Sequence, residues 1–347
     1  VLKVIFRLYK GKVLHLTKYK EVKRNHHYVW SHYLRRWAEN NNIFYISKKG
    51  KISNDSIKGL ARETDFYKIS PLNSKDVEYI REFSSLSPKF LRELHESHLK
   101  HFIKLSSVSN TISQLGIESE DLKSIDNIIK HNSLEDLHSI FENDAVKVMN
   151  ELSDGNKNVL STNANMISFC SYIGHQISRT RAFKENSLKV VKAGTFRINA
   201  DPEYLALFEK NWWFLSFIFG LNMGMSFYES KERDNHIFIT NKTTTPFITS
   251  DNPIINVHKS MKELAEGEAP IKADFFIPLS PQYAYMINNS SDYNHLMRAI
   301  TVEEVNDFNK AIYNKYNKTI FSSEAYVLNK LKADSKSKKG VGKVKEI

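Results

Sequence analysis

The stretch Trp212-Trp-Phe-Leu-Ser-Phe-Ile-Phe-Gly-Leu-Asn-Met-Gly-Met-Ser-Phe-Tyr228 is the most apolar run in the chain and decides how the fold is interpreted. It has 17 residues and includes three polar side chains, whereas a membrane-spanning helix needs about 20 predominantly apolar residues. Its Gly220-x-x-x-Gly224 spacing is typical of helices that pack closely. We therefore predict a buried core helix and no membrane span.

The residues on either side of this run predict a mainly helical body followed by strands. Amphipathic patterns with start and stop signals predict helices over residues 29–38, 76–84, 88–115, 118–131, 133–152, 159–193 and 202–230, with Gly116 as the stop of the third. A capping box of Thr301 and Glu304 predicts a further helix to about Tyr316. Residues 43–52 predict an early hairpin that turns at Gly50. From residue 236 onward, short β-branched and aromatic runs alternate with prolines. The predicted class is α+β, with a smaller, mostly antiparallel β-containing part at the C-terminal end.

Length and charge indicate how the domain is bounded. The 347 residues carry a net charge of +11, but residues 1–36 contribute +9 and residues 330–347 contribute +5, which leaves the body at −3. We predict one domain over residues 23–328, helical to residue 230 and β-containing from 231. Residues 1–22 are predicted to be an extension, either poorly ordered or the product of a gene start placed too far upstream. Residues 329–347 are predicted to be a basic, disordered tail.

The same features restrict location and partners. Cys170 is the only cysteine, so the fold needs no disulfide, and its apolar neighbours predict a buried thiol rather than a nucleophile. With no continuous apolar segment near the N-terminus, a cytoplasmic location is expected. The nearly neutral body argues against binding of long nucleic acid. A nucleotide or a nucleic-acid end is the partner that fits better, and no protein partner is indicated.

Cofactor and metal signatures are missing from the sequence. It contains no phosphate-binding loop, no dinucleotide fingerprint, no HExxH and no paired CxxC. His95, His98 and His101 share a helix face, but they offer only part of the ligand set that a metal needs. We expect neither a metal site nor a cofactor.

Three polar segments are candidates for chemistry. Adjacent His26 and His27 precede a predicted helix, whose N-terminal dipole would keep an imidazole neutral and able to accept a proton. Gln176 and Arg179 lie one turn apart on a later helix. Asp251 and Asn252 follow a strand, as carboxylates and amides do in Asx turns and at cleft edges. Capping, an exposed helix face and a turn are the corresponding structural interpretations.

These segments, in order, resemble the domain of unknown function family 4238, a mostly bacterial family. The resemblance covers residues 23–326. It rests on the following motifs: Asn25-His-His-Tyr-Val29, Tyr33-Leu-Arg-Arg-Trp37, Asp65-Phe-Tyr67, Gln176 to Arg181, Ser250-Asp-Asn-Pro253, Ile277-Pro-Leu-Ser-Pro281 and Val305-Asn306.

The chain departs from the family pattern at two places. Trp30 stands where the family usually has proline after His-Tyr-Val, so the family histidine corresponds to His27 rather than His26. Arg181 stands where the family usually continues Arg-Thr with proline. The resemblance implies no particular activity, and it favours residues 1–20 lying outside the domain.

Two functional hypotheses follow from these residues. In the first, His27 is a general base, Asp251 its orienter or an acid, and Arg179 a charge stabiliser in a metal-independent hydrolase or nuclease-like effector acting on a phosphate-containing substrate. Asn25, His26, Gln176, Arg181 and Asn252 would bind that substrate. In the second, the protein is a non-catalytic sensor or interaction protein, and the same side chains form a buried hydrogen-bond network.

Overall fold

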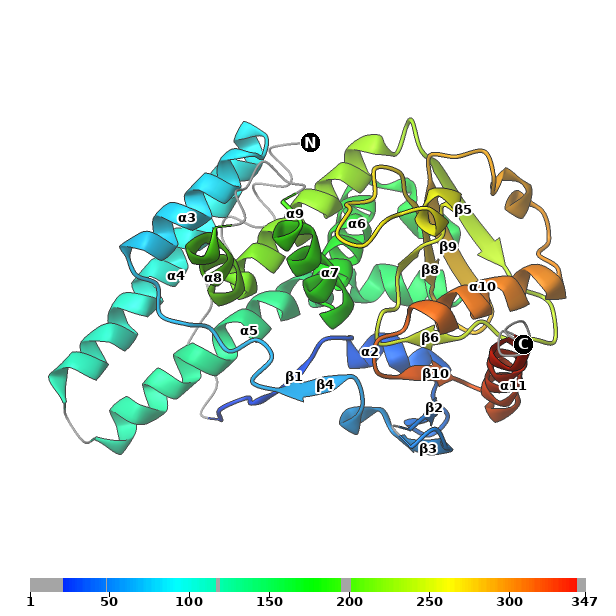
Figure 1. The fold of residues 1–347 in the computed structure, drawn as a ribbon, viewed down its shortest axis with the longest axis horizontal. Helices are drawn as coiled ribbons and strands as arrows, with labels where there is room; N and C mark the ends of the chain where they lie inside the picture. Colours follow the sequence, from blue (N-terminus) through cyan, green and yellow to red (C-terminus); the bar gives the residue numbers. More distant parts are fainter. Residues whose placement is uncertain (1–20, 48, 117–118, 195–200, 342–347) are drawn as a thin grey trace, which may run out of the picture.

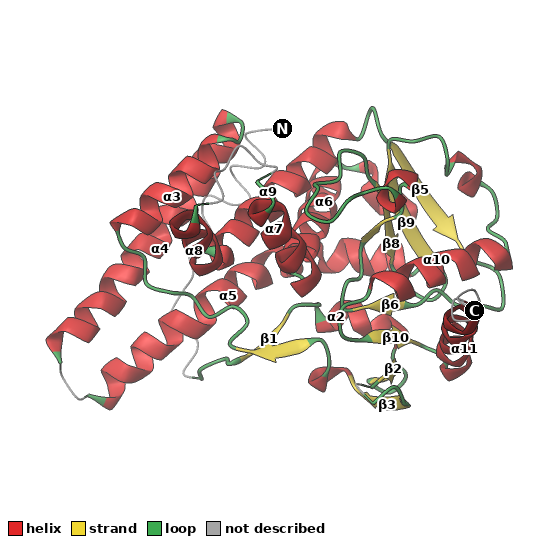
Figure 2. Ribbon diagram, in the orientation of Figure 1, coloured by secondary structure: helices red, strands yellow, loops and turns green. Residues whose placement is uncertain are grey.

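In a computed structural model the chain is an α+β protein with a helical body and antiparallel sheets packed at one end (Figures 1 and 2). The structure describes residues 21–47, 49–116, 119–194 and 201–341. The predicted fold class is confirmed. The helices of the body are α3 (Ser74–Ser85), α4 (Lys89–Leu115), α5 (Glu120–Ser153), α6 (Asn163–Ser178), α7 (Arg181–Lys192), α8 (Pro202–Lys210) and α9 (Trp212–Ser230).

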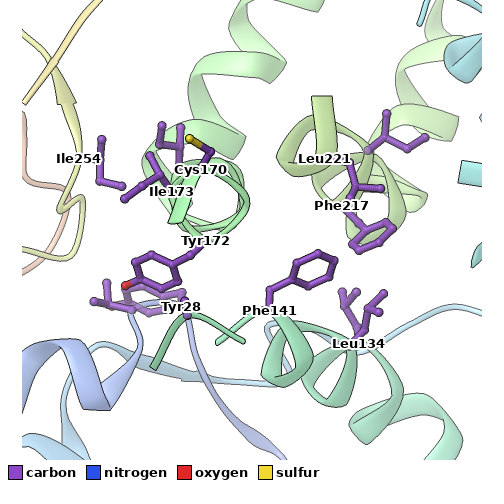
Figure 3. Packing of buried hydrophobic residues seen from close by; sticks show 14 of the residues in the cluster. Tyr28, Leu134, Phe141, Cys170, Tyr172, Ile173, Phe217, Leu221 and Ile254 are labelled. Carbon is purple, nitrogen blue, oxygen red and sulfur yellow. The ribbon is translucent and has the colours of Figure 1, made fainter. Parts of the chain in front are cut away.

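Helices α6 and α9 form the centre of the body, and glycines allow their backbones to touch. A β-carbon added to Gly174 would lie 2.3 Å from the Gly220 carbonyl oxygen and 2.5 Å from the Gly224 nitrogen. Around this contact, Cys170 and Ile173 of α6 and Phe217 and Leu221 of α9 are buried (Figure 3). The predicted core helix and buried thiol are therefore confirmed. None of the described helices is long and apolar enough to span a lipid bilayer.

Three predicted helix boundaries are wrong. The helices predicted over 118–131 and 133–152 are one helix, α5 (Glu120–Ser153), because the Ser133 hydroxyl donates to the Ile129 carbonyl oxygen inside the helix instead of capping a new one. The predicted helix 159–193 is divided into α6 and α7, where the Thr180 hydroxyl caps the second helix by accepting from the Phe183 N–H. The predicted helix 202–230 is likewise divided at Asn211.

The predicted first helix begins later than expected. Residues Asn25–His27 form strand β1, which pairs antiparallel with β4 (Arg62–Thr64). The helix α2 covers only Ser31–Leu34 and continues as a 3-10 turn over Arg35–Trp37. His26 and His27 therefore lie in an extended segment, and no helix dipole acts on them.

The described residues form two four-stranded sheets, and one of them combines strands from the early and late parts of the chain. One has the order β3 (Ile52–Ser56), β2 (Asn42–Ile46), β10 (Ile320–Ser322) and β6 (Thr249–Ser250). The other has the order β5 (Asn235–Thr240), β9 (Tyr283–Asn288), β8 (Asp274–Pro278) and β7 (Ile255–Asn256). The predicted hairpin at Gly50, where φ is 72°, is confirmed as β2–β3. Its pairing with β10 means that β structure is not confined to the C-terminal part.

The C-terminal segment is helical where disorder was predicted. Helix α10 (Val302–Lys315) begins with the predicted capping box of Thr301 and Glu304. Helix α11 (Ala325–Val341) packs into a second cluster of buried hydrophobic residues, which it shares with strands of the sheets. Its own members of this cluster are Val327, Leu328 and Leu331. The predicted tail therefore continues this helix from residue 329 to residue 341. Residues 342–347 of the tail and residues 1–20 of the predicted extension lie outside the described residues.

Candidate functional site

The first candidate segment is a strap, residues 21–28, that lies against α5. Lys23 donates through its backbone N–H to the Asn132 Oδ1 at 2.8 Å and through Nζ to Asp136 at 2.6 Å. Asn132 in turn donates to the Glu21 carbonyl oxygen at 3.0 Å. Asn25 lies on the exposed side of the strap, where it accepts a hydrogen bond from the Thr64 hydroxyl at 3.2 Å.

His26 anchors the strap and has both ring nitrogens engaged. The Tyr67 N–H donates to Nδ1 at 2.7 Å, so that nitrogen must be unprotonated. The Nε2–H is then the donor to the His131 carbonyl oxygen at 2.8 Å. Burial lowers the pKa of His26, which keeps this neutral tautomer. His26 thus fixes β1 and the loop after β4 to α5.

The side chain of His27 lies in a different environment from that of His26 and is half-buried. Burial lowers the pKa of its imidazole, and the neighbouring charges of Arg62 and Arg179 lower it further, while the Lys58 backbone opposes them. Burial and these cations therefore disfavour the charged imidazole; His27 lies in β1 and not at the helix N-terminus that the sequence predicted.

Gln176 and Arg179 lie together at the C-terminal end of α6 and are buried. Gln176 donates to the Tyr28 carbonyl oxygen at 3.0 Å and accepts from Arg179 at 2.7 Å. The second arm of Arg179 pairs with Glu142 of α5 at 2.6 Å, in a bridge whose side chains are 2% and 15% exposed. The predicted exposed helix face is thus an internal contact between α6, α5 and the strap.

Helix α5 carries buried or partly buried titratable side chains near Arg179 that the sequence analysis missed. Glu135, His138 and Glu142 have i, i+3 and i+7 spacing, so they project from one side of the helix. Both carboxyl groups interact electrostatically with Arg179, and burial raises the pKa of Glu135 to about 7. The sequence contained a signal for these side chains, because polar residues alternate there with the apolar residues Leu134, Leu137 and Phe141 that form the buried stripe of the helix.

Two imidazoles complete this buried region. His138 and His175 lie with their rings 5.8 Å apart, and neither ring nitrogen of either residue has a hydrogen-bond partner among the described residues. Burial holds the pKa of both well below the ordinary histidine value. The His175 ring packs against Phe141 at 4.0 Å and Phe217 at 5.2 Å. They therefore pack as neutral aromatic rings.

The Asp251 side chain stabilises the turn at residues 317–319. Its carboxylate accepts from the backbone N–H groups of Asn317, Lys318 and Thr319, at 2.9, 2.5 and 3.1 Å. Burial raises the pKa of Asp251, and these three donors oppose the rise. Asn252 is similarly used, because its side chain donates to the Lys315 carbonyl oxygen at 3.0 Å. Both residues fix the segment between α10 and β10.

Arg181 belongs to an ion cluster nearer the surface. Its guanidinium pairs with both oxygens of Glu63, and Lys318 Nζ lies 3.0 Å from the same carboxylate. Burial alone would raise the pKa of Glu63, but the hydrogen bonds from Arg181 and Lys318 lower it below its ordinary value. The cluster connects β4, the start of α7 and the turn after α10.

By their hydrogen bonds, the candidate residues form three groups: the strap with Gln176 and Arg179, the turn held by Asp251 and Asn252, and the ion cluster of Arg181. The charge of Arg179 acts on His27, and the charge of Asp251 acts on Tyr28. Tyr28 is bonded at its carbonyl to Gln176, and its hydroxyl lies in the field of Asp251, Glu63 and Arg181.

Two hollows of the surface lie elsewhere. One of about 580 Å³ is lined by α3 and α4, including Val77, Arg81 and Ile103, and one of about 280 Å³ lies between α3 and α8. None of the candidate residues lines either hollow. Among the described residues, no group of three or more His, Cys, Asp or Glu side chains is placed to hold a metal ion.

Comparison with known proteins gives one match. The sequence profile of the family described as "Protein of unknown function (DUF4238)" matches residues 25–325. No curated protein and no solved structure matches the chain significantly. Because the matched region covers most of the chain, from strand β1 to the start of helix α11, the chain belongs to the family of proteins of unknown function DUF4238.

Proposed function

We propose that this protein is a non-catalytic sensor or interaction protein, in which the polar family motifs form a buried network that joins distant segments. The observation that carries the proposal is the use of the Asp251 carboxylate, which accepts from three consecutive backbone N–H groups. A carboxylate engaged in this way has little remaining capacity to accept or donate a proton during a reaction.

The other motif residues support the same interpretation. His26 joins β1 to α5, Gln176 joins α6 to the strap, and Arg179 joins α6 to α5. Each bond spans more than 30 residues in sequence, apart from the local pair of Gln176 and Arg179. Such buried networks, when their members are paired, specify one arrangement of the packed elements.

A hydrolase or nuclease-like effector acting on a nucleotide or nucleic-acid end is the second candidate. The half-buried His27, neutral and near Arg179, favours it because this is the state that a general base requires. The charges near Arg179 argue against a phosphate there, since Glu142 already pairs with the guanidinium and Glu135 also faces it. The non-catalytic proposal is therefore better supported.

A comparison of variants separates the two candidates. His27→Ala, Arg179→Met and Asp251→Asn would be measured for melting temperature and for release of phosphate from a panel of nucleotides and 5′- or 3′-phosphorylated oligonucleotides. We expect no release by the wild type, and clear losses of melting temperature in Arg179→Met and Asp251→Asn. Asp307→Asn, at a carboxylate that is 70% exposed on α10, is the matched control.

Turnover by the wild type that is abolished in His27→Ala at an unchanged melting temperature would overturn the proposal. That result would favour the hydrolase, with His27 acting on the substrate.

A further inference from the structure

We propose that the outer edge of strand β3 is a docking site for an extended, acidic peptide segment, which adds to the four-stranded sheet as a further strand. This inference rests on the proposed interaction role and names the class of partner. Two features carry it: the direction of the backbone groups of β3 and the cations around them.

Strand β3 is the exposed edge of its sheet. The sheet has the order β3-β2-β10-β6, so β3 pairs only with β2 among the described strands. In Figure 1 it lies at the lower margin of the molecule. Residues 54–56 are exposed, whereas both residues of β6, at the opposite edge, are fully buried. Of the two edges of this sheet, β3 is therefore the accessible one.

The register of the β2–β3 hairpin fixes the direction of each backbone group. The Ser47 N–H donates to the Lys51 carbonyl oxygen at 2.8 Å, and the Ile57 N–H donates to the Asn41 carbonyl oxygen at 3.0 Å. Between these two bonds the strands are in continuous antiparallel register. Hydrogen-bonded pairs alternate with non-bonded pairs in such a ladder. The odd-numbered residues of β3 are therefore the ones bonded to β2.

The even-numbered residues of β3 present their backbone groups outward. The N–H and C=O groups of Ser53 and Asp55 point to β2, so those of Ile52, Asn54 and Ser56 point away from it. A row of outward N–H and C=O groups on a sheet edge is a template for the main chain of another strand. Peptides are recognised in this way by addition to a sheet edge.

Helix α11 holds the hairpin in place from one face of the sheet. Lys332 Nζ donates to the Gly50 carbonyl oxygen in the turn. The side chain of Ile52 packs against the cluster that contains Val327 and Leu328 of α11. Because side chains project from the faces of a sheet, these contacts place α11 over a face, and residues 54–56 remain exposed along the edge. A preformed edge loses little conformational entropy when it binds a strand.

Cations outnumber anions around this edge. Residues 49–62 carry a net charge of +3, from four exposed cations and one carboxylate: Lys49, Lys51, Lys58, Arg62 and Asp55. Lys51 directly precedes β3, and Lys58 lies two residues after its end. A strand with acidic residues at both ends therefore meets a cation at each end of the edge, which favours it over a neutral or basic strand.

The same cations disfavour two other occupants. If β3 paired antiparallel with β3 of a second copy, centred on Asn54, Lys51 of one copy would lie beside Lys58 of the other. Facing like charges destabilise a sheet, and edge lysines oppose self-association. A nucleic acid would use the cations but not the backbone groups of the edge, because phosphate oxygens only accept hydrogen bonds. An acidic peptide uses both.

The first test is binding of a fluorescein-labelled peptide, Glu-Glu-Val-Thr-Val-Thr-Val-Glu-Glu, to the full chain by fluorescence anisotropy. We expect saturable binding that weakens as NaCl is raised from about 50 to about 300 mM. A control peptide of the same charge has two prolines in place of the middle Thr-Val pair. It should bind at least about tenfold more weakly, since proline removes ladder hydrogen bonds in either register. Equal binding of the two peptides would overturn the proposal.

Variants of β3 separate the backbone from the side chains. Asn54→Pro removes an outward N–H that the hairpin does not use, and proline is tolerated at such edge positions. It should weaken peptide binding at least about tenfold, with a melting temperature within about 2 °C of the wild type. Asn54→Ala, which keeps the N–H, is the matched control and should bind as the wild type does.

A charge reversal tests the cations independently of the backbone. Lys51→Glu/Lys58→Glu should weaken binding of the acidic peptide about tenfold. The same double variant should gain binding of Lys-Lys-Val-Thr-Val-Thr-Val-Lys-Lys, which the wild type should not bind. Unchanged binding of both peptides by the double variant would overturn the assignment to this edge.

Amide exchange resolved to single residues tests the geometry directly. In the free protein the N–H groups of Ser53 and Asp55 should be protected, and those of Ile52, Asn54 and Ser56 should exchange freely. Saturation with the acidic peptide should slow exchange of these three amides at least about tenfold. Peptide-induced protection located elsewhere in the chain would overturn the proposal.

Two further outcomes would also overturn it: an anisotropy that the acidic peptide does not change, or binding of an oligothymidylate that displaces the peptide. These outcomes are distinct from failure of the proposed function, which is decided by phosphate release. A catalytically active wild type that binds the peptide as expected would refute the non-catalytic role and leave the docking edge in place.

Discussion

At the scale of single residues, Asp251 is a side chain whose hydrogen bonds hold one turn of the backbone. Its two oxygens satisfy three N–H groups of the turn at 317–319. In Asp251→Asn one oxygen is replaced by an NH₂ group, which cannot accept from these donors. Hydrogen bonds to charged groups contribute about 1.5–3 kcal/mol each, so we expect a loss of about 2–4 kcal/mol in the free energy of unfolding.

Urea unfolding would measure this loss, with Asp307→Asn as the exposed control, expected to change stability by less than about 0.5 kcal/mol. Equal effects of the two substitutions would contradict the structural role of Asp251.

The Arg179–Glu142 pair allows a second residue-scale prediction. Removing one member leaves a buried charge without its partner, so Arg179→Met should destabilise the fold by about 3–5 kcal/mol. The double variant Arg179→Met/Glu142→Leu replaces the pair with apolar side chains and should recover much of that loss. A double-mutant cycle by chemical denaturation measures the coupling. Simple additivity of the two changes would show that the residues do not act as a pair.

Buried neutral histidines give a prediction in the acidic range. The folded-state pKa values of His26, His138 and His175 are lowered by burial, so the unfolded chain binds protons first as the pH falls below 6.5. Stability is therefore present above pH 6.5 and is lost as the pH falls. Each imidazole contributes at most about 1.4 kcal/mol per pH unit. His138→Phe should make the urea midpoint less dependent on pH between 6.5 and 5, whereas an unchanged slope would exclude this residue as a cause.

Sequence reasoning at this scale indicated polar residues more readily than their partners. It selected Gln176 and Arg179 from a local pattern, and their side chains are hydrogen-bonded to each other. It could not supply Glu142 or Tyr28, because those contacts cross 37 and 148 residues and depend on how α5, α6 and the strap pack. The prediction for His26 failed for a local reason, since β1 takes the place of the expected helix entry.

At the scale of elements, the crossing of α6 and α9 depends on the absence of side chains at three glycines. In Gly174→Ala the new β-carbon would meet the backbone of α9 at 2.3 Å, and backbone cannot move aside as a flexible side chain can. We expect a loss of about 3 kcal/mol, by overpacking of the helix pair. Gly59→Ala is the control, because nothing lies within 4 Å of its added carbon. Comparable thermal stabilities of both variants would contradict the close crossing.

Element prediction succeeded where local chemistry decides and failed where long-range packing decides. The capping box at Thr301 and the stop at Gly116 were predicted from sequence and are present. The continuity of α5 through Ser133 was missed, since a serine signals a helix start only when its own backbone is extended. The α6–α7 division at Thr180 was missed because no glycine or proline marks it between residues 175 and 193.

At the scale of the whole molecule, the helical body and the sheets share one core. The larger hydrophobic cluster includes Phe169 of α6 together with Tyr285 of β9, whose rings lie 5.0 Å apart. The sheet β3-β2-β10-β6 joins residues near both ends of the described chain. Tyr33 of α2 bonds to Thr249 and Pro278, which adds a buried polar link between the two parts. Cooperative unfolding of the two parts as one unit should follow from this arrangement.

Two fragments and two probes test that expectation. The first fragment is residues 21–341. Its tryptophan fluorescence should give the same urea midpoint as its far-ultraviolet circular dichroism. This fluorescence reports on Trp212 and Trp213 in the body and on Trp30 and Trp37 near the sheets. A fragment ending at residue 230 would expose the face of α6 that Tyr285 covers, and it should not give a cooperative transition. Separate midpoints for the two probes, or a cooperatively folded fragment, would instead divide the chain into two domains and would make the shared core a domain interface.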